Sequence, residues 1–211
     1  MKNHRTWLIA CAGVVLACVG QSEASLSTAS QSVDSGVEFT VDLWPGEGIP
    51  VIEARRAMLL LHAEPDPDSP VVDTVRAPVG RRLVFDATRF QTIKPGTIRS
   101  LAPMQVTGRD MGSTTHVSHD QYYLPTTPDV SVPLAAATTI DYLQYRAEGT
   151  CFVRIERRVI DAHPCPGFGP ESVIVERQPL TRWWIRLQGE SGAAGWILVS
   201  DSTAQSVRRE F

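Results

Sequence analysis

The sequence predicts an all-β fold made of many short strands, and three observations favour this class. Short apolar runs, such as residues 71–75 and 151–156, have the length and the β-branched composition of strands. Clusters of glycine and proline separate such runs, for example at residues 44–50 and 64–70, where repeated proline excludes a helix interior or a central strand. Residues 182–187 alternate basic and apolar side chains before a glycine-containing reversal. Short strands punctuated in this way are typical of a β-sandwich or a small barrel.

The composition is that of a globular protein without a nucleic-acid partner. Of the 211 residues, 43% are hydrophobic and 20% are charged, which is enough apolar surface to form a core. The formal net charge is -3, and acidic and basic residues are interspersed. Nucleic-acid binding requires clustered lysine and arginine, so we expect no nucleic-acid partner.

The N-terminal segment predicts export. Lys2 and Arg5 precede an uncharged, mostly apolar run at residues 7–19, and small residues around Ala24 suit cleavage. This pattern is typical of a secretory signal peptide over residues 1–24. The run is shorter than the 20 or so apolar residues that span a bilayer, so we expect no membrane span and a location in the periplasm or cell envelope.

An alternative processing site leaves a second interpretation open. Residues 15–18 read Val-Leu-Ala-Cys and resemble a bacterial lipobox, in which Cys18 would carry the lipid after removal of residues 1–17. The serine- and glutamine-rich stretch that follows would then serve as a flexible tether, assigned to residues 25–36. The chain is therefore either a soluble exported protein or one held by a lipid anchor.

The cysteines of the body predict a disulfide. Cys151 and Cys165 are the two cysteines outside the leader, and an even pair in an exported chain is most simply a disulfide. The alternative is a nucleophilic cysteine beside His163, but Pro164 and Pro166 make that segment a rigid connector.

The C-terminal hairpin resembles a known family. Residues 184–187 read Trp-Ile-Arg-Leu, and after a turn residues 195–197 read Gly-Trp-Ile. This pattern resembles the closing hairpin of bacterial SH3-type (SH3b) domains, which often reads Trp-x-Lys-Val, a turn, then Gly-Trp-Val. The resemblance implies a small β-barrel in an exported binding module rather than an enzyme.

Residues 61–85 are similar to the first half of the same family, with a strand, an acidic Pro/Ser loop, Pro-Val-Val, a glycine turn and an apolar strand. We therefore expect two small SH3-like β-barrels in tandem. The first would span residues 37–124 and the second residues 139–203. A Pro/Thr-rich linker would occupy residues 125–138, and residues 204–211 would form a tail.

The tryptophans and arginines of the hairpin are the candidate binding residues. Adjacent Trp183 and Trp184 must point to opposite faces of a regular strand, so one of them should be exposed. We assign Trp184 to a ligand groove, with Arg182 and Arg186 supplying charge-assisted hydrogen bonds. Trp183 and Trp196 are assigned to the core, the latter by resemblance.

These features together predict a non-enzymatic binding module of the bacterial cell envelope. Its aromatic groove would recognise peptidoglycan, a peptide or an envelope protein, without metal or cofactor. The sequence has no Gly-x-Ser-x-Gly, no His-Glu-x-x-His and no Gly-rich phosphate loop with lysine.

One alternative function rests on a histidine cluster. His116, His119 and Asp120 lie within five positions, and imidazole and carboxylate are normal ligands of divalent metals. A metal-binding or hydrolytic envelope protein would need a further ligand, for which His62 and His163 are distant candidates.

Overall fold

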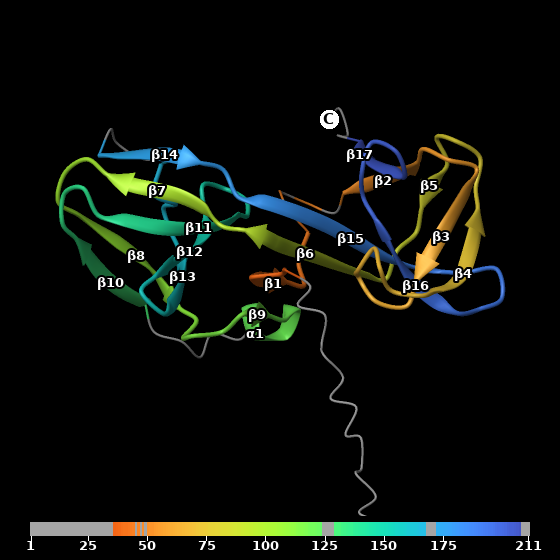
Figure 1. Ribbon diagram of the computed structural model, residues 1–211, viewed down its shortest axis with the longest axis horizontal. Helices are drawn as coiled ribbons and strands as arrows, with labels where there is room; N and C mark the ends of the chain where they lie inside the picture. The colour runs from red at the N-terminus through yellow and green to blue at the C-terminus, as the bar shows by residue number, and fades with distance from the viewer. Residues whose placement is uncertain are drawn as a thin grey trace, which may run out of the picture. The chain divides into compact units, whose positions relative to one another are not determined.

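Strands account for almost all regular structure in the computed structural model, which describes residues 36–44, 46, 48, 50–123, 129–167 and 172–207. The all-β prediction is therefore confirmed (Figure 1). The elements in chain order are β1 (Phe39–Val41), β2 (Val51–Ala54), β3 (Met58–His62), β4 (Val71–Arg76), β5 (Arg82–Leu83), β6 (Ala87–Lys94), β7 (Gly96–Ser100), β8 (Met104–Asp110), β9 (His116–Val117), α1 (His119–Tyr123), β10 (Asp129–Leu134), β11 (Thr139–Tyr145), β12 (Cys151–Ile155), β13 (Arg158–Ala162), β14 (Val173–Arg177), β15 (Leu180–Gln188), β16 (Ala194–Leu198) and β17 (Ala204–Val207).

These strands form three sheets. One seven-stranded sheet has the order β4-β3-β16-β15-β6-β1-β9, and a second has the order β10-β8-β13-β12-β11-β7-β14. We call them the first and the second sheet. A three-stranded sheet, β17-β2-β5, completes the fold. Pairing is antiparallel except between β1 and β9, which run parallel.

The first sheet joins strands from residues 58–94 to the C-terminal hairpin. Strand β16 pairs with β3 through Trp196 and His62, and β15 pairs with β6 from Leu180 to Arg186. The inner faces of these strands share one hydrophobic core, which includes Leu59, Leu61, Ile185, Leu187 and Ile197.

The expected tandem arrangement of two barrels is not confirmed, because strand pairing crosses the expected boundary between them. The apolar faces of β3 and of the C-terminal hairpin cover each other, so neither closes a barrel by itself. Residues 204–207, expected to belong to a tail, form β17 and pair with β2, and Ala204 is buried in the same core.

The second sheet draws its strands from residues 96–177 and has its own core. That core includes Ile98, Val106, Ile140, Val153 and Ile160. The expected linker at residues 125–138 is replaced over 129–134 by β10, which pairs with β8 along its whole length and buries Leu134. The alternating exposure of β10 explains why a valine-containing stretch interrupted by proline can serve as an edge strand.

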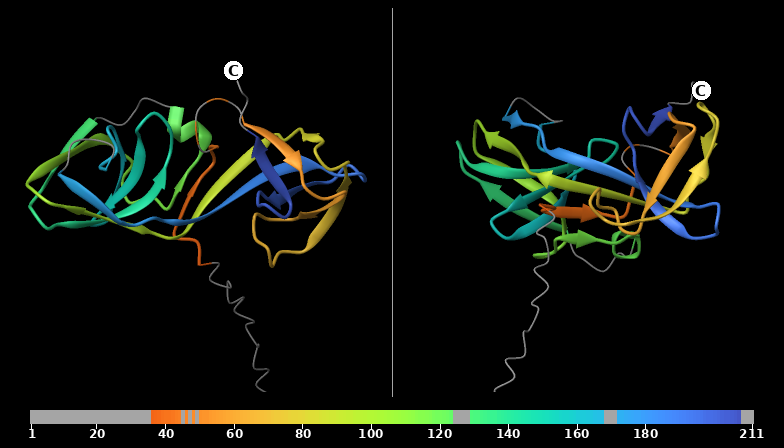
Figure 2. Two further views of the ribbon diagram at one scale, coloured as in Figure 1. Left: turned by 90° about the horizontal axis from the view of Figure 1, so that it is seen from above. Right: turned by 45° about the vertical axis from the view of Figure 1, so that its right-hand side comes forward.

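Two of the passages of the chain between the two large sheets are very short, and both contain a proline. Pro95 alone separates β6 from β7, and Gln178 and Pro179 separate β14 from β15. The strand pairs β6–β15 and β7–β14 therefore follow one another along the chain (Figures 1 and 2). Proline lacks an amide hydrogen and interrupts a ladder, which is consistent with a change of sheet at both positions.

A third apolar cluster joins β1 and β9 to strands of the second sheet. Phe39 packs against Phe152 with ring centroids 5.3 Å apart, and Val117 and Leu143 are buried beside them. Strand β1 belongs to the first sheet, so this cluster contributes packing between elements of both sheets.

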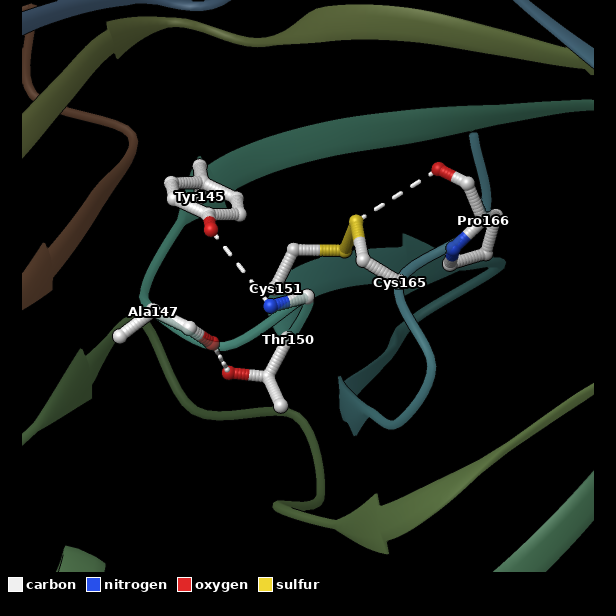
Figure 3. Close-up of a disulfide and its surroundings, with 7 residues drawn as sticks. Tyr145, Ala147, Thr150, Cys151, Cys165 and Pro166 are labelled. Atoms are coloured by element: carbon white, nitrogen blue, oxygen red, sulfur yellow. Dashed lines mark hydrogen bonds between the residues drawn. A yellow bond between two sulfur atoms is a disulfide. The ribbon is translucent and has the colours of Figure 1, made fainter. Parts of the chain in front are cut away.

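Cys151 and Cys165 form a disulfide, as predicted (Figure 3). Cys151 begins β12, and Cys165 follows β13 with an amide that donates to the Gly149 carbonyl at 2.6 Å. The Thr150 hydroxyl donates to the Ala147 carbonyl at 2.6 Å in the same turn. Both sulfur-bearing residues are buried in the core of the second sheet, so the cross-link joins that core to the segment before β14.

The expected signal peptide, Cys18 and the tether up to residue 35 lie outside the described residues. All described residues belong to one compact unit, Val33–Phe211. Within them, no helix has the length and apolar character needed to cross a bilayer.

We predict that reduction of the disulfide lowers the free energy of unfolding by about 3 kcal/mol, because the unfolded chain then regains the entropy of a closed loop. The cysteines are 14 positions apart. Urea unfolding followed by tryptophan fluorescence, with and without reductant, measures the change. The double variant Cys151→Ala/Cys165→Ala should no longer respond to reductant, and an unchanged midpoint after verified reduction would contradict the prediction.

We predict that Gly195→Ala destabilises the protein by about 1–3 kcal/mol, because a side chain there overpacks the contact between β16 and β3. A Cβ atom at Gly195 would lie 2.7 Å from the Leu61 Cβ and 2.9 Å from the His62 carbonyl oxygen. The neighbouring exposed Ala194→Ser is the control and should be nearly neutral. Equal urea midpoints for the two variants would argue against the shared core.

Candidate ligand groove

A hollow of about 650 Å³ lies beside the C-terminal hairpin, and we call it the groove. Its wall begins in the segment after β1, continues through β5 into the start of β6, and is completed by β15, β16 and α1. The lining residues are Asp42, Trp44, Pro50, Arg82, Leu83, Val84, Phe85, Asp86, Ala87, Thr88, Arg89, His119, Arg186 and Trp196. The groove thus joins segments more than 100 residues apart in sequence.

Aromatic and aliphatic side chains form the apolar part of the groove. Trp196 is buried except for 8% of its surface, and Leu83 is equally buried in the core below. Trp44 and Phe85 are half-buried. Val84 is 86% exposed at the rim. An exposed valine next to accessible aromatic surface is a suitable contact for an apolar group of a ligand.

Two ion pairs flank the tryptophan. Arg89 donates from Nε to the Asp42 carboxylate at 2.8 Å, and Arg186 donates from Nε to Asp86 at 2.9 Å. The two guanidinium carbons lie 5.2 Å and 5.9 Å from the centroid of the Trp196 ring. Cation–π attraction and the paired carboxylates therefore hold both guanidinium planes beside the apolar part of the groove.

The charged side chains of the groove include one arginine, Arg82, that is available to bind an anionic ligand group. The hydrogen bond from Arg186 to the Asp86 carboxylate raises the pKa of the guanidinium above its ordinary value, so Arg186 stays charged. Arg82 also lines the groove and is exposed, and its side chain has no hydrogen bond or ion pair with the residues that the structure describes. Arg82 can therefore donate to an anionic group of a ligand without breaking an existing pair.

The predicted cluster of His116, His119 and Asp120 does not converge. His116 in β9 instead contacts Asp42, with 2.9 Å between its Nε2 and a carboxylate oxygen. His119 lines the groove, whereas Asp120 is 95% exposed and lies 3.6 Å from His119 Nδ1. No group of three histidine, cysteine or acidic side chains suited to a metal occurs within the described part of the chain.

Trp184 is not a groove residue, which corrects the prediction from the sequence. Its side chain is 1% exposed, and its Nε1 donates to the Gln91 side-chain oxygen at 2.9 Å. The Gln91 amide donates in turn to the Pro65 carbonyl at 3.0 Å. The loop after β3 therefore covers the face of the hairpin strand that was expected to be open.

Trp183 packs against the core of the first sheet, whereas Trp196 is buried but is not part of that apolar cluster. Trp183 is half-buried against the core of the first sheet and donates from Nε1 to the Thr88 hydroxyl at 2.6 Å. Trp196 is buried, and its remaining surface lines the groove. Both faces of the strand are therefore covered. The two-residue alternation of a strand predicts that the adjacent tryptophans point to opposite faces, but it does not predict which of them stays accessible.

Of the predicted binding arginines, the structure places Arg186 in the groove but not Arg182. Arg182 is half-buried and does not line the hollow. Sequence reasoning missed Asp42, Trp44 and Arg89, because nothing local in the sequence relates residues 42–44 to position 89. Trp44 within a cluster of glycine and proline was the one available signal, since a large aromatic residue in such a loop is often placed for contact.

Comparison with protein-family models, with curated proteins and with solved structures finds no match to this chain.

We predict that Trp184→Phe lowers the free energy of unfolding by about 1–3 kcal/mol, because it leaves the buried Gln91 oxygen without its donor. The control is Leu180→Ala on the same strand, whose side chain is 60% exposed and should contribute little. Urea unfolding measures both variants. Unchanged stability of Trp184→Phe would contradict the buried, hydrogen-bonded position of this indole.

Proposed function

We propose that this chain is a non-enzymatic binding module of the bacterial cell envelope, and that its ligand is a peptide segment held in the groove. The observation that carries the proposal is the position of Trp196 within 5.9 Å of two guanidinium groups that carboxylates hold in place. A pocket that combines apolar surface with a few fixed polar groups is typical of specific ligand sites.

The groove favours a peptide over a neutral sugar. An apolar side chain of the ligand would contact Val84, Phe85 and the accessible part of Trp196. A carboxylate of the ligand would accept hydrogen bonds from Arg82, whose side chain has no partner among the residues that the structure describes. The peptide cross-links of peptidoglycan carry both kinds of group, so they are the first ligand to test.

We further propose that residues 51–94 and 180–207 together make one SH3-type unit, into which residues 95–179 are inserted. The resemblance of residues 61–85 and of residues 184–197 to the two halves of that family supports this, because both segments line a single core. The buried disulfide and the leader-like N-terminal sequence support an extracytoplasmic location.

We predict that Arg82→Glu weakens binding to purified peptidoglycan sacculi at least about tenfold, because a carboxylate there repels the ligand and removes a charge-assisted hydrogen bond. Co-sedimentation of the protein with sacculi measures the affinity. The matched control is Arg81→Glu, which makes the same charge change at the exposed neighbouring residue that does not line the groove. Val84→Asp in the groove and Val79→Asp outside it form a second matched pair.

Equal pelleting of Arg82→Glu, Val84→Asp and the wild type would show that the groove is not the binding site. Absence of pelleting of the wild type would exclude peptidoglycan as the ligand. In that case, cross-linking of the wild type and the same four variants in envelope fractions would test whether the groove takes a protein partner.

A further inference from the structure

A second hollow, of about 660 Å³, lies against the second sheet and is separate in its residues from the groove. Strands β8, β10 and β13 and the turn after β11 provide its lining. We call it the arginine hollow, because Arg109 of β8 and Arg146 after β11 both lie in its wall, with Asp161 of β13 between them.

Both arginines are held against one aromatic ring. The guanidinium carbon of Arg109 lies 4.7 Å from the centroid of the Tyr122 ring, and that of Arg146 lies 4.1 Å from it. Their side chains are only 17% and 18% exposed. The two charged groups are therefore held in place and mostly removed from water. In such a position each guanidinium requires hydrogen-bond acceptors other than water.

The acceptors present do not satisfy the donors. Arg109 donates from Nη1 to the Tyr122 carbonyl at 2.6 Å and from Nη2 to Asp161 at 3.1 Å, but its buried Nε has no acceptor among the described residues. Arg146 makes no hydrogen bond to a described residue through its guanidinium, and its buried Nη1 is 3.6 Å from Asp161. A guanidinium has five N–H donors, and a buried donor without an acceptor destabilises the fold.

The charges around the hollow also show that the two arginines are incompletely compensated. Burial lowers the pKa of the Arg146 guanidinium below its ordinary value, which the Asp161 carboxylate opposes. Burial also raises the pKa of Asp161, which the two arginines oppose. Asp161 is therefore the main counter-ion of two mostly buried cations, and the exposed Glu148 is a weaker one for Arg146. Asp129 and His163 also line the hollow, and both are exposed.

We propose that the arginine hollow binds an oxyanion, a carboxylate or a phosphate, through the unpartnered N–H groups of Arg146 with Arg109 Nε as the second donor. An oxyanion seated there supplies the missing acceptors and the missing negative charge at once. Guanidinium forks match the geometry of both anions. This proposal does not depend on the function assigned to the groove.

The test is a titration of the mature, disulfide-bonded protein with inorganic phosphate and, separately, with acetate. The readout is the set of arginine Nε–Hε signals in nuclear magnetic resonance spectra, at an ionic strength kept constant with chloride. We expect saturable shifts of the Arg146 and Arg109 signals. Saturation with acetate alone identifies a carboxylate site, and saturation with phosphate alone identifies a phosphate site.

Arg146→Gln should weaken the response at Arg109 at least tenfold. The control Arg158→Gln changes an exposed arginine of the same sheet that is paired with Asp110, and it should leave the response unchanged. Arg82→Glu should also leave it unchanged, which separates this site from the groove. Absence of a saturable shift with either anion in the wild type would overturn the proposal, as would an unchanged response in folded Arg146→Gln.

Discussion

The antiparallel ladder between β6 and β15 is the constraint on which the rest of the structure depends. It pairs two strands about 90 residues apart in sequence, from Lys94 opposite Leu180 to Ala87 opposite Arg186. Strand β15 pairs on its other side with β16, which reaches β3. The N-terminal strands can therefore bury their apolar faces only after the C-terminal hairpin has joined them. Contacts of such long range require the closure of a large loop before any of them stabilises the fold.

The groove is a consequence of this ladder. Its register places Arg186 beside Asp86, and the pairing of β1 with β6 places Arg89 beside Asp42, so that both guanidinium groups lie near the Trp196 ring. A shift of one residue in the register would turn Arg186 to the opposite face and bring Ile185 or Leu187 to the groove. The chemistry of the site is therefore specified by strand pairing rather than by any short motif.

The second sheet has a different basis for its stability and contains the other candidate site. Its core is separate from that of the first sheet, and the Cys151–Cys165 disulfide joins that core to the segment before β14. Two mostly buried arginines with Asp161 as their main counter-ion are an arrangement that favours neither packing nor stability by itself. Such a cluster is easier to explain as a binding feature than as a structural one, because apolar residues of similar volume would fill the same space at lower free-energy cost.

The sequence by itself determined the strand-rich class, the disulfide and the opposite orientation of Trp183 and Trp184, because each depends on local chemistry: two-residue alternation, turn composition and cysteine pairing. It also indicated Arg186 as a binding residue and Trp196 as a core residue. Only the tertiary structure decided that Trp184 is covered, that β10 replaces a linker, and that His116 contacts Asp42 instead of His119 and Asp120. The physical reason is that the apolar face of a strand must be buried against another element, but the sequence of the strand does not specify which element. Several strands here have equivalent faces, and the choice among them is made by the packing of the whole core.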